Sequence, residues 1–207
     1  MDQLIAELKA KNVLRQPAIE GALRAVDRAD FVPVELRASA YLDEALPTAF
    51  GQTISQPYTV VFMLAQLGVK PGDHVVDIGS GSGWLSALLA ELVGETGRVY
   101  AIELRPELCR FGELNVAKYP ALAKRTQFFC QNASSGLPAI AKKIGGFDRI
   151  VAAAAVNQVP IAWREQLKVG GRLLYPHGYA LVVEDKISPT DWRKTAYAGF
   201  IFVPFVE

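Results

Sequence analysis

The sequence predicts an α/β fold with a doubly wound, mostly parallel sheet of seven strands, preceded by N-terminal helices and followed by an antiparallel C-terminal edge. Between residues 74 and 167, apolar strand-like runs alternate with helix-like segments, which is typical of parallel sheets. After residue 171, three strand-like runs follow with almost no helix between them, which favours antiparallel pairing. We expect one domain over residues 1–207, with helices and a loop in 1–70 and the α/β core in 71–207.

The first 70 residues contain two helix patterns before a loop-rich stretch. Residues 1–12, MDQLIAELKAKN, form an amphipathic pattern with acids and lysines rather than a signal peptide, so a cytoplasmic location is expected. A second helix is predicted to start near Pro17, because proline suits the first turn and Ile19, Leu23 and Val26 share one face. No apolar run reaches the roughly 20 residues needed to cross a bilayer.

From residue 74 onward, the strands and helices follow one another in a regular order. The predicted strands are HVVDIG (74–79), GRVYAIEL (97–104), TQFFCQ (126–131), FDRIVAAAA (147–155), GRLLYPHG (171–178), YALVVEDKI (179–187) and TAYAGFIFVPFV (195–206). The helices are predicted from residue 84, over 106–119 and over 160–167.

Composition excludes several classes of function. The 22 basic and 21 acidic residues leave a net charge of +1 without long runs of either sign, so we expect neither a nucleic-acid nor a membrane partner. Cys109 and Cys130 lack a disulfide or metal spacing motif, and two buried thiols are expected. His74 and His177 are too few and too scattered for zinc chemistry, so no metal is expected.

A glycine-rich turn joins the first predicted strand to the helix that follows it. In HVVDIGSGSGW, residues 74–84, Gly79, Gly81 and Gly83 let the backbone turn sharply and approach a ligand, because no Cβ stands in the way. A dinucleotide-binding GxGxxG turn requires a small residue at the position of Trp84. The pattern is instead DxGxGxG, with Asp77 as its acidic first residue.

An acidic residue ends the next predicted strand. Glu103 lies 20 residues beyond Gly83, at the carboxyl end of GRVYAIEL. A carboxylate at this edge of an open sheet can accept both hydroxyl hydrogens of a ribose. The alternative is that Glu103 is a solvated residue at the start of a helix, because RPEL follows it.

A polar loop precedes the glycine-rich turn. GQTISQPYTV, residues 51–60, holds Thr53, Ser55 and Gln56 among apolar residues and starts a helix at Pro57. Ser55 lies at or next to the N-cap position of that helix, so its hydroxyl could merely cap the helix, although capping and ligand contact are not exclusive.

These motifs together resemble those of the protein-L-isoaspartate O-methyltransferase family over nearly the whole chain. Residues 41–67, YLDEALPTAFGQTISQPYTVVFMLAQL, are similar to the family signature, and residues 75–92, VVDIGSGSGWLSALLAEL, to its cofactor motif. QLKVGGRLLYPHG (166–178) and FIFVPF (200–205) resemble its C-terminal strands.

The resemblance implies a sheet of the S-adenosylmethionine-dependent methyltransferase type and S-adenosyl-L-methionine as the cofactor. It further implies methylation of the α-carboxylate of L-isoaspartyl residues in damaged proteins and peptides, a protein-repair activity with Ser55 as the catalytic residue, and a monomer is expected. The cofactor-binding residues that the resemblance implies are Gln52, Thr53, Ile54, Ser55, Asp77, Gly79, Ser80, Gly81, Ser82, Gly83, Glu103, Leu104, Asn132 and Ala133.

One motif departs from the family pattern. Where the family usually has Gly-Asp-Gly after a strand, this chain has Gln131, Asn132 and Ala133. The carbonyl oxygen of Asn132 can accept a hydrogen bond from the adenine amine, but it carries no charge. Ala133 disfavours backbone angles that glycine takes easily, so an altered cofactor contact is expected.

The residue types fit methyl transfer to a carboxylate. A carboxylate is already ionised at neutral pH and needs no base, so the site has to aim the reactants, and Ser55 would orient the acceptor. A nucleic-acid methyltransferase would carry an Asn-Pro-Pro-aromatic motif or a cysteine nucleophile, and VAAAAVNQVP, residues 151–160, has neither. A methyltransferase for a dedicated peptide and a cofactor-binding adaptor without catalysis remain alternatives.

Overall fold

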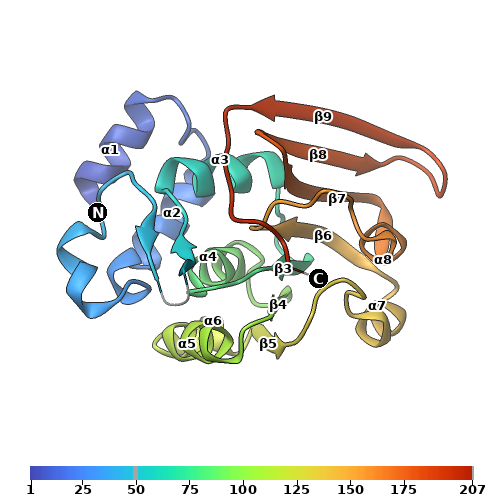
Figure 1. Ribbon diagram of the computed structural model, residues 1–207, viewed down its shortest axis with the longest axis horizontal. Coiled ribbons are helices and arrows are strands. Elements are labelled where there is room, and N and C mark those ends of the chain that lie inside the picture. The colour runs from blue at the N-terminus through green and yellow to red at the C-terminus, as the bar shows by residue number, and fades with distance from the viewer. Residues whose placement is uncertain (49–50, 207) are drawn as a thin grey trace.

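A seven-stranded sheet forms the centre of the computed structural model, which describes residues 1–48 and 51–206 (Figure 1). The strand order is β5-β4-β3-β6-β7-β8-β9, parallel from β5 to β7 and antiparallel in the last two pairs. The bounds are β3 His74–Ile78, β4 Arg98–Glu103, β5 Thr126–Cys130, β6 Phe147–Ala152, β7 Leu167–His177, β8 Ala180–Lys186 and β9 Trp192–Ala198. The predicted mostly parallel sheet with an antiparallel edge is confirmed.

Helices lie before and between the strands. The helical bounds are α1 Asp2–Ala10, α2 Pro17–Ala25, η1 Arg28–Asp30, η2 Val34–Ser39, α3 Pro57–Leu67, α4 Trp84–Leu92, α5 Pro106–Ala117, α6 Pro120–Ala123, α7 Pro138–Ile144 and α8 Ile161–Glu165. The predicted starts of helices at Pro17 and at Trp84 are confirmed. A two-stranded hairpin of β1 (Leu46–Pro47) and β2 (Thr53–Ile54) precedes α3. Ala49 and Phe50, within the family signature, lie outside the described residues.

The two faces of the sheet pack against different helices because side chains alternate along each strand. Val75, Val99 and Val151 belong to a core shared with α1 to α4, whereas Val76 and Ile102 belong to a second core with residues of α7 and α8. In this way residues 1–70 and one face of the sheet share a single apolar core.

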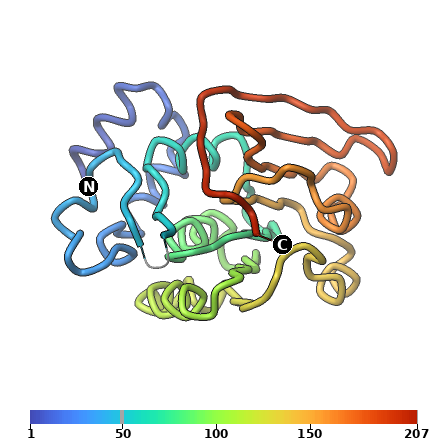
Figure 2. The backbone as a smooth tube through the Cα atoms, viewed as in Figure 1, coloured from blue at the N-terminus to red at the C-terminus, as the bar shows by residue number. Residues whose placement is uncertain are grey.

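The last predicted strand is shorter than expected. TAYAGFIFVPFV was predicted as one strand over 195–206, but β9 ends at Ala198 and the chain turns at Gly199, whose φ is +99°. Figure 2 shows the following segment running down from the end of β9 toward the middle of the sheet. It is held there by hydrogen bonds of Ala155 N–H to the carbonyl of Val203 and of Phe205 N–H to the carbonyl of Ala155, both 2.8 Å.

The expectation of two buried thiols is wrong. Cys109 in α5 and Cys130 at the end of β5 form a disulfide with a Cα–Cα distance of 5.7 Å, and Cys130 is exposed. Helix α5 starts at the carboxyl end of β4, and the parallel strand β5 ends at the same edge. One helix and one strand therefore bring cysteines 21 positions apart into contact, which no short spacing motif reveals.

Candidate active site

A cavity of about 550 Å³ lies at the carboxyl ends of β3 and β4, between the loop before α3 and the segment after β9. Most of the predicted site residues line it: Gln52, Thr53, Ile54, Ser55, Gly79, Ser80, Gly81, Ser82, Glu103, Leu104 and Ala133. Asp77, Gly83 and Asn132 are not among the described residues that line it. The fold thus brings the polar loop, the glycine-rich turn and the end of β4 together around one space.

The glycine-rich turn forms one wall of the cavity. Gly79 and Ser80 donate their backbone N–H groups to the carbonyl of Ile102 on β4, which holds the turn against the neighbouring strand. The hydroxyl of Ser80 is buried and has no hydrogen-bond partner among the described residues. Ser80 also lines the cavity, so its unpaired hydroxyl lies in the wall of the site.

Gly83 serves the packing of the turn rather than its ligand face. A Cβ built on Gly83 would lie 2.7 Å from the carbonyl oxygen of Gly112 in α5, and a Cβ on Gly112 would lie 2.7 Å from the carbonyl oxygen of Gly81. Real Cβ atoms essentially never approach so closely, so the turn and α5 meet only because both positions are glycine.

Asp77 lies under the turn, at the end of β3. It is fully buried, and one carboxylate oxygen accepts a hydrogen bond of 2.5 Å from the hydroxyl of Ser86 in α4. The other oxygen has no partner among the described residues. Burial raises the pKa of the Asp77 carboxyl to about 7, against the opposing effect of the Ser86 hydrogen bond.

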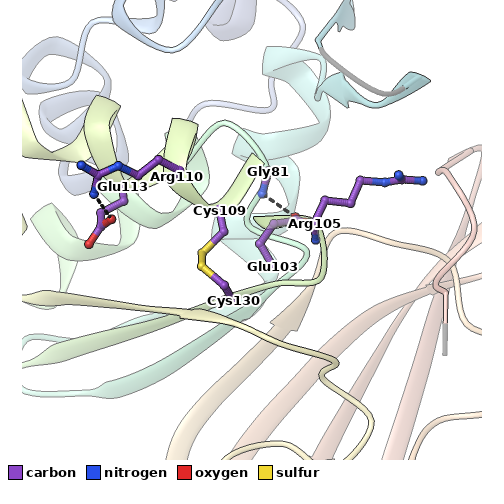
Figure 3. The surroundings of a disulfide bond; sticks show 7 residues. All are labelled: Gly81, Glu103, Arg105, Cys109, Arg110, Glu113 and Cys130. Atoms are coloured by element: carbon purple, nitrogen blue, oxygen red, sulfur yellow. Dashed lines mark hydrogen bonds and ion pairs between the residues drawn. A yellow bond between two sulfur atoms is a disulfide. The ribbon is translucent and has the colours of Figure 1, made fainter. Parts of the chain in front are cut away.

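Glu103 is held at the end of β4 by two backbone donors. One carboxylate oxygen accepts the N–H of Gly81 and the other the N–H of Arg105, each at 3.0 Å. Figure 3 shows the carboxylate of Glu103 directed toward Gly81 beside the Cys109–Cys130 disulfide. Glu103 is only 8% exposed, so the alternative of a solvated helix-start residue is wrong.

The departure from the family pattern lies beside the cavity. Asn132 is exposed, and its side-chain oxygen accepts the N–H of Ser134 at 2.7 Å. Ala133 is buried and accepts the indole N–H of Trp163 at its carbonyl, 2.8 Å away. Gln131 and Ala133 line the cavity and Asn132 does not. The asparagine oxygen that was predicted to meet adenine accepts a hydrogen bond within a local turn.

Ser55 follows the hairpin and is half-buried at the cavity wall. Ser55 lies next to the N-cap residue of α3, as predicted, because Gln56 occupies the N-cap position, where no side-chain cap bond is made. The first turn is instead satisfied by Asp43, whose carboxylate accepts the N–H of Tyr58 at 2.7 Å. The position of Ser55 therefore depends on residues outside the helix it precedes.

Sequence reasoning missed the segment after β9 as part of the site. Gly199 and all of residues 200–206 line the cavity, although FIFVPF was interpreted as a strand. The glycine that interrupts the run at Gly199 is the sequence signal that could have indicated a separate segment. In the structure, Ile201 of this segment is 79% exposed and Val206 is 54% exposed. Within VAAAAVNQVP, Ala152 is fully buried in the sheet, while Ala153 and Ala154 line the cavity.

Other kinds of site find no support in the described part of the chain. Residues 1–48 and 51–206 contain no group of three or more histidine, cysteine or acidic side chains that could hold a metal ion. Within the same residues, no helix has the length and apolar character needed to span a membrane.

The sequence of the chain matches one protein family over its whole length. The family model described as Protein-L-isoaspartate(D-aspartate) O-methyltransferase (PCMT) matches residues 1–207. A protein-L-isoaspartate O-methyltransferase of Methanopyrus kandleri is 34% identical over 209 aligned residues, covering 99% of this chain and 90% of the relative. One from Ignicoccus hospitalis is 36% identical over 210 residues, with 99% and 96% covered.

The fold is also similar to that of solved structures. A Plasmodium falciparum protein assigned as a protein-L-isoaspartate O-methyltransferase, crystallised with S-adenosyl-L-homocysteine, gives a TM-score of 0.88 at 24% identity and covers 99% of this chain and 97% of its own. At this identity the likeness concerns the fold, and it extends over the N-terminal helices as well as the sheet.

Proposed function

Because this chain belongs to the protein-L-isoaspartate O-methyltransferase family, we propose that it methylates the α-carboxylate of L-isoaspartyl residues in damaged proteins and peptides. The chain is an S-adenosylmethionine-dependent methyltransferase of this family. The observation that carries the proposed site is that Ser55 and Glu103, 48 positions apart in the sequence, line the same cavity.

The cavity fits S-adenosyl-L-methionine, which when bound supplies an electrophilic methyl group. Glu103 is held by two N–H donors and retains lone pairs for the ribose hydroxyls. The unpaired hydroxyl of Ser80 would become a polar partner at the glycine-rich turn if its side chain rotates toward the cofactor. Leu104, which is 39% exposed at the cavity, offers an apolar surface to an adenine ring, as does the buried Leu108.

Binding the acceptor requires orientation and exclusion of water rather than a base. The isoaspartyl carboxylate is ionised at neutral pH. Ser55 would donate its hydroxyl to that carboxylate and hold it in line with the methyl group. The segment after β9, residues 199–206, closes the other side of the cavity and would contact the peptide backbone on either side of the isoaspartate.

We also propose that the chain forms one domain and acts on peptides rather than on nucleic acids. A single apolar core joins α1, α2 and α3 to one face of the sheet, which supports one domain over residues 1–207, with helices and substrate loop in 1–70 and the cofactor-binding core in 71–207. The net charge of +1 supports peptide rather than nucleic-acid substrates. We further propose that it acts as a monomer in the cytoplasm, on isoaspartyl-containing proteins and peptides.

The function is tested by radiolabelled methyl transfer to an isoaspartyl peptide and to its normal aspartyl counterpart. We expect label in the isoaspartyl peptide alone, and a loss of turnover in Ser55→Ala with little change in affinity for S-adenosylhomocysteine. Ser39→Ala, a half-buried serine that does not line the cavity, is the control and should behave as wild type. Equal labelling of both peptides would reject the repair function. Cofactor binding without labelling of either peptide would leave the adaptor and the dedicated-peptide alternatives.

A further inference from the structure

Arg28 is a buried cation that holds two segments of backbone together. It lies in η1 and is 0% exposed. One terminal nitrogen donates to the carbonyl oxygens of Ala40 (2.8 Å) and Leu42 (3.2 Å). The other donates to the carbonyl oxygens of Glu44 (2.9 Å) and Ser55 (3.0 Å). One side chain therefore connects residues 40–44 with the residue proposed to orient the methyl acceptor.

The same guanidinium lies against the start of α4. Its central carbon is 5.1 Å from the centre of the Trp84 ring, within the range of a cation–π contact. Trp84 follows Gly83 directly and lines the cavity. Arg28 thus contacts both the substrate loop and the residue that follows the glycine-rich turn.

Stability alone explains this arrangement poorly. Burial of a cation is costly, and apolar side chains of similar volume often serve packing equally well. The Nε of Arg28 is buried without a partner among the described residues, and its acceptors are neutral carbonyl groups rather than carboxylates. A planar guanidinium can, however, fix several acceptors in one geometry, which lysine and apolar residues cannot do.

We propose that Arg28 is a positioning residue that sets the direction of the Ser55 side chain, an inference that rests on the function proposed above. A fixed carbonyl fixes the whole planar peptide unit that follows Ser55, and with it the Cα from which the hydroxyl extends. Asp43 holds the next residues, because its backbone carbonyl accepts the side-chain N–H of Gln56 at 2.9 Å and its carboxylate accepts the N–H of Tyr58. Arg28 thus holds the carbonyl group of Ser55, and Asp43 holds the residues that follow Ser55 at the start of α3.

The test compares Arg28→Lys with Arg37→Lys, an exposed arginine of η2. Lysine keeps the charge but cannot reach four carbonyl oxygens in a fixed fork. We expect Arg28→Lys to lower kcat/KM for an isoaspartyl peptide by about 10-fold or more per folded molecule, since small misplacements of reacting groups reduce rates steeply. Affinity for S-adenosylhomocysteine should change by less than about 3-fold, and Arg37→Lys should match wild type.

A double-variant cycle separates positioning from general stability. If Arg28 acts through Ser55, Arg28→Lys should have little further effect on kcat/KM in a Ser55→Ala background. Additive effects, or wild-type kcat/KM with a lowered thermal midpoint, would overturn the inference and leave the proposed function intact. If Arg28→Lys does not fold, Arg28→Gln, which is uncharged and keeps an amide donor, replaces it. Failure of both to fold would make Arg28 a purely structural residue. A wild-type chain that labels no isoaspartyl peptide would remove the proposed function and this inference together.

Discussion

The carboxylate of Glu103 accepts the backbone N–H of Gly81, so the end of β4 is tied directly to the glycine-rich turn that follows β3. The N–H of Arg105 holds the second carboxylate oxygen. With both oxygens engaged, the carboxylate has one orientation, and its remaining lone pairs keep a fixed direction. The residue proposed to bind ribose is therefore oriented before the cofactor arrives.

Replacement of Glu103 should weaken cofactor binding more than it weakens the fold. We expect Glu103→Ala to lose at least about 1.5 to 3 kcal/mol of affinity for S-adenosylhomocysteine, the value of one charge-assisted hydrogen bond. Calorimetric titration measures this loss. Glu107→Ala, an exposed acid in the first turn of α5, is the matched control and should bind as wild type. Unchanged affinity in Glu103→Ala would place the ribose elsewhere.

Gly112 should resist a substitution that normally stabilises helices. Alanine is favoured over glycine in a helix interior by about 1 kcal/mol. At Gly112, however, a Cβ would lie 2.7 Å from the carbonyl oxygen of Gly81, so Gly112→Ala has to displace the glycine-rich turn. We expect a lower thermal midpoint and weaker S-adenosylhomocysteine binding.

The matched control is Gly21→Ala, an exposed position in α2 where a Cβ would meet nothing within 4 Å. This variant should be neutral or more stable, by up to about 1 kcal/mol. If Gly112→Ala and Gly21→Ala shift the thermal midpoint alike, the close approach of α5 to the turn does not constrain the site.

The sequence predicted the elements that depend on local patterns and missed contacts between distant residues. The alternation of strands and helices after His74 and the place of Glu103 at the carboxyl end of β4, beside the glycine-rich turn, follow from periodicity and from the topology of parallel sheets. Arg28 has no local signature, because an arginine after a short helix usually lies at the surface. Its burial depends on carbonyl groups up to 27 positions away.

Two site residues show the same limit in different ways. The sequence places Asp77 as the acid before the turn, but its complete burial depends on how α4 packs, and periodicity does not describe that. Asn132 was expected to face the adenine amine, and its side-chain oxygen instead accepts the N–H of Ser134, a local bond that asparagine commonly makes in turns. Whether either residue contacts the cofactor stays a prediction.

Asp77 should make stability depend on pH in a defined direction. Its pKa is raised by burial from an ordinary value of 3.8 to about 7, so between these values the folded chain holds a proton that the unfolded chain has released. The contribution of Asp77 to the free energy of unfolding therefore decreases as pH rises from about 4 to about 7, by up to about 1.4 kcal/mol per pH unit, and is constant above that range.

Denaturant unfolding of wild type and Asp77→Asn, measured without cofactor from pH 4 to pH 8, tests this dependence. Relative to the variant, wild type should lose stability up to about pH 7 and then follow a parallel line. A difference between the two proteins that is independent of pH would show that the pKa of Asp77 is not raised in the folded chain.

The Cys109–Cys130 disulfide should stabilise both the fold and the cofactor end of the cavity. It closes a loop over a sequence separation of 21 residues, and bonds of this kind contribute about 2 to 4 kcal/mol. Cys130 pairs in register with Glu103, and its neighbour Gln131 lines the cavity. We expect a reductant to lower the thermal midpoint of wild type and to weaken S-adenosylhomocysteine binding.

The double variant Cys109→Ala with Cys130→Ser is the control: its thermal midpoint should lie near that of reduced wild type and should not change when the reductant is added. Two titratable thiols in the denatured, unreduced protein would contradict the disulfide, and equal midpoints with and without reductant would limit it to a passive link between α5 and β5.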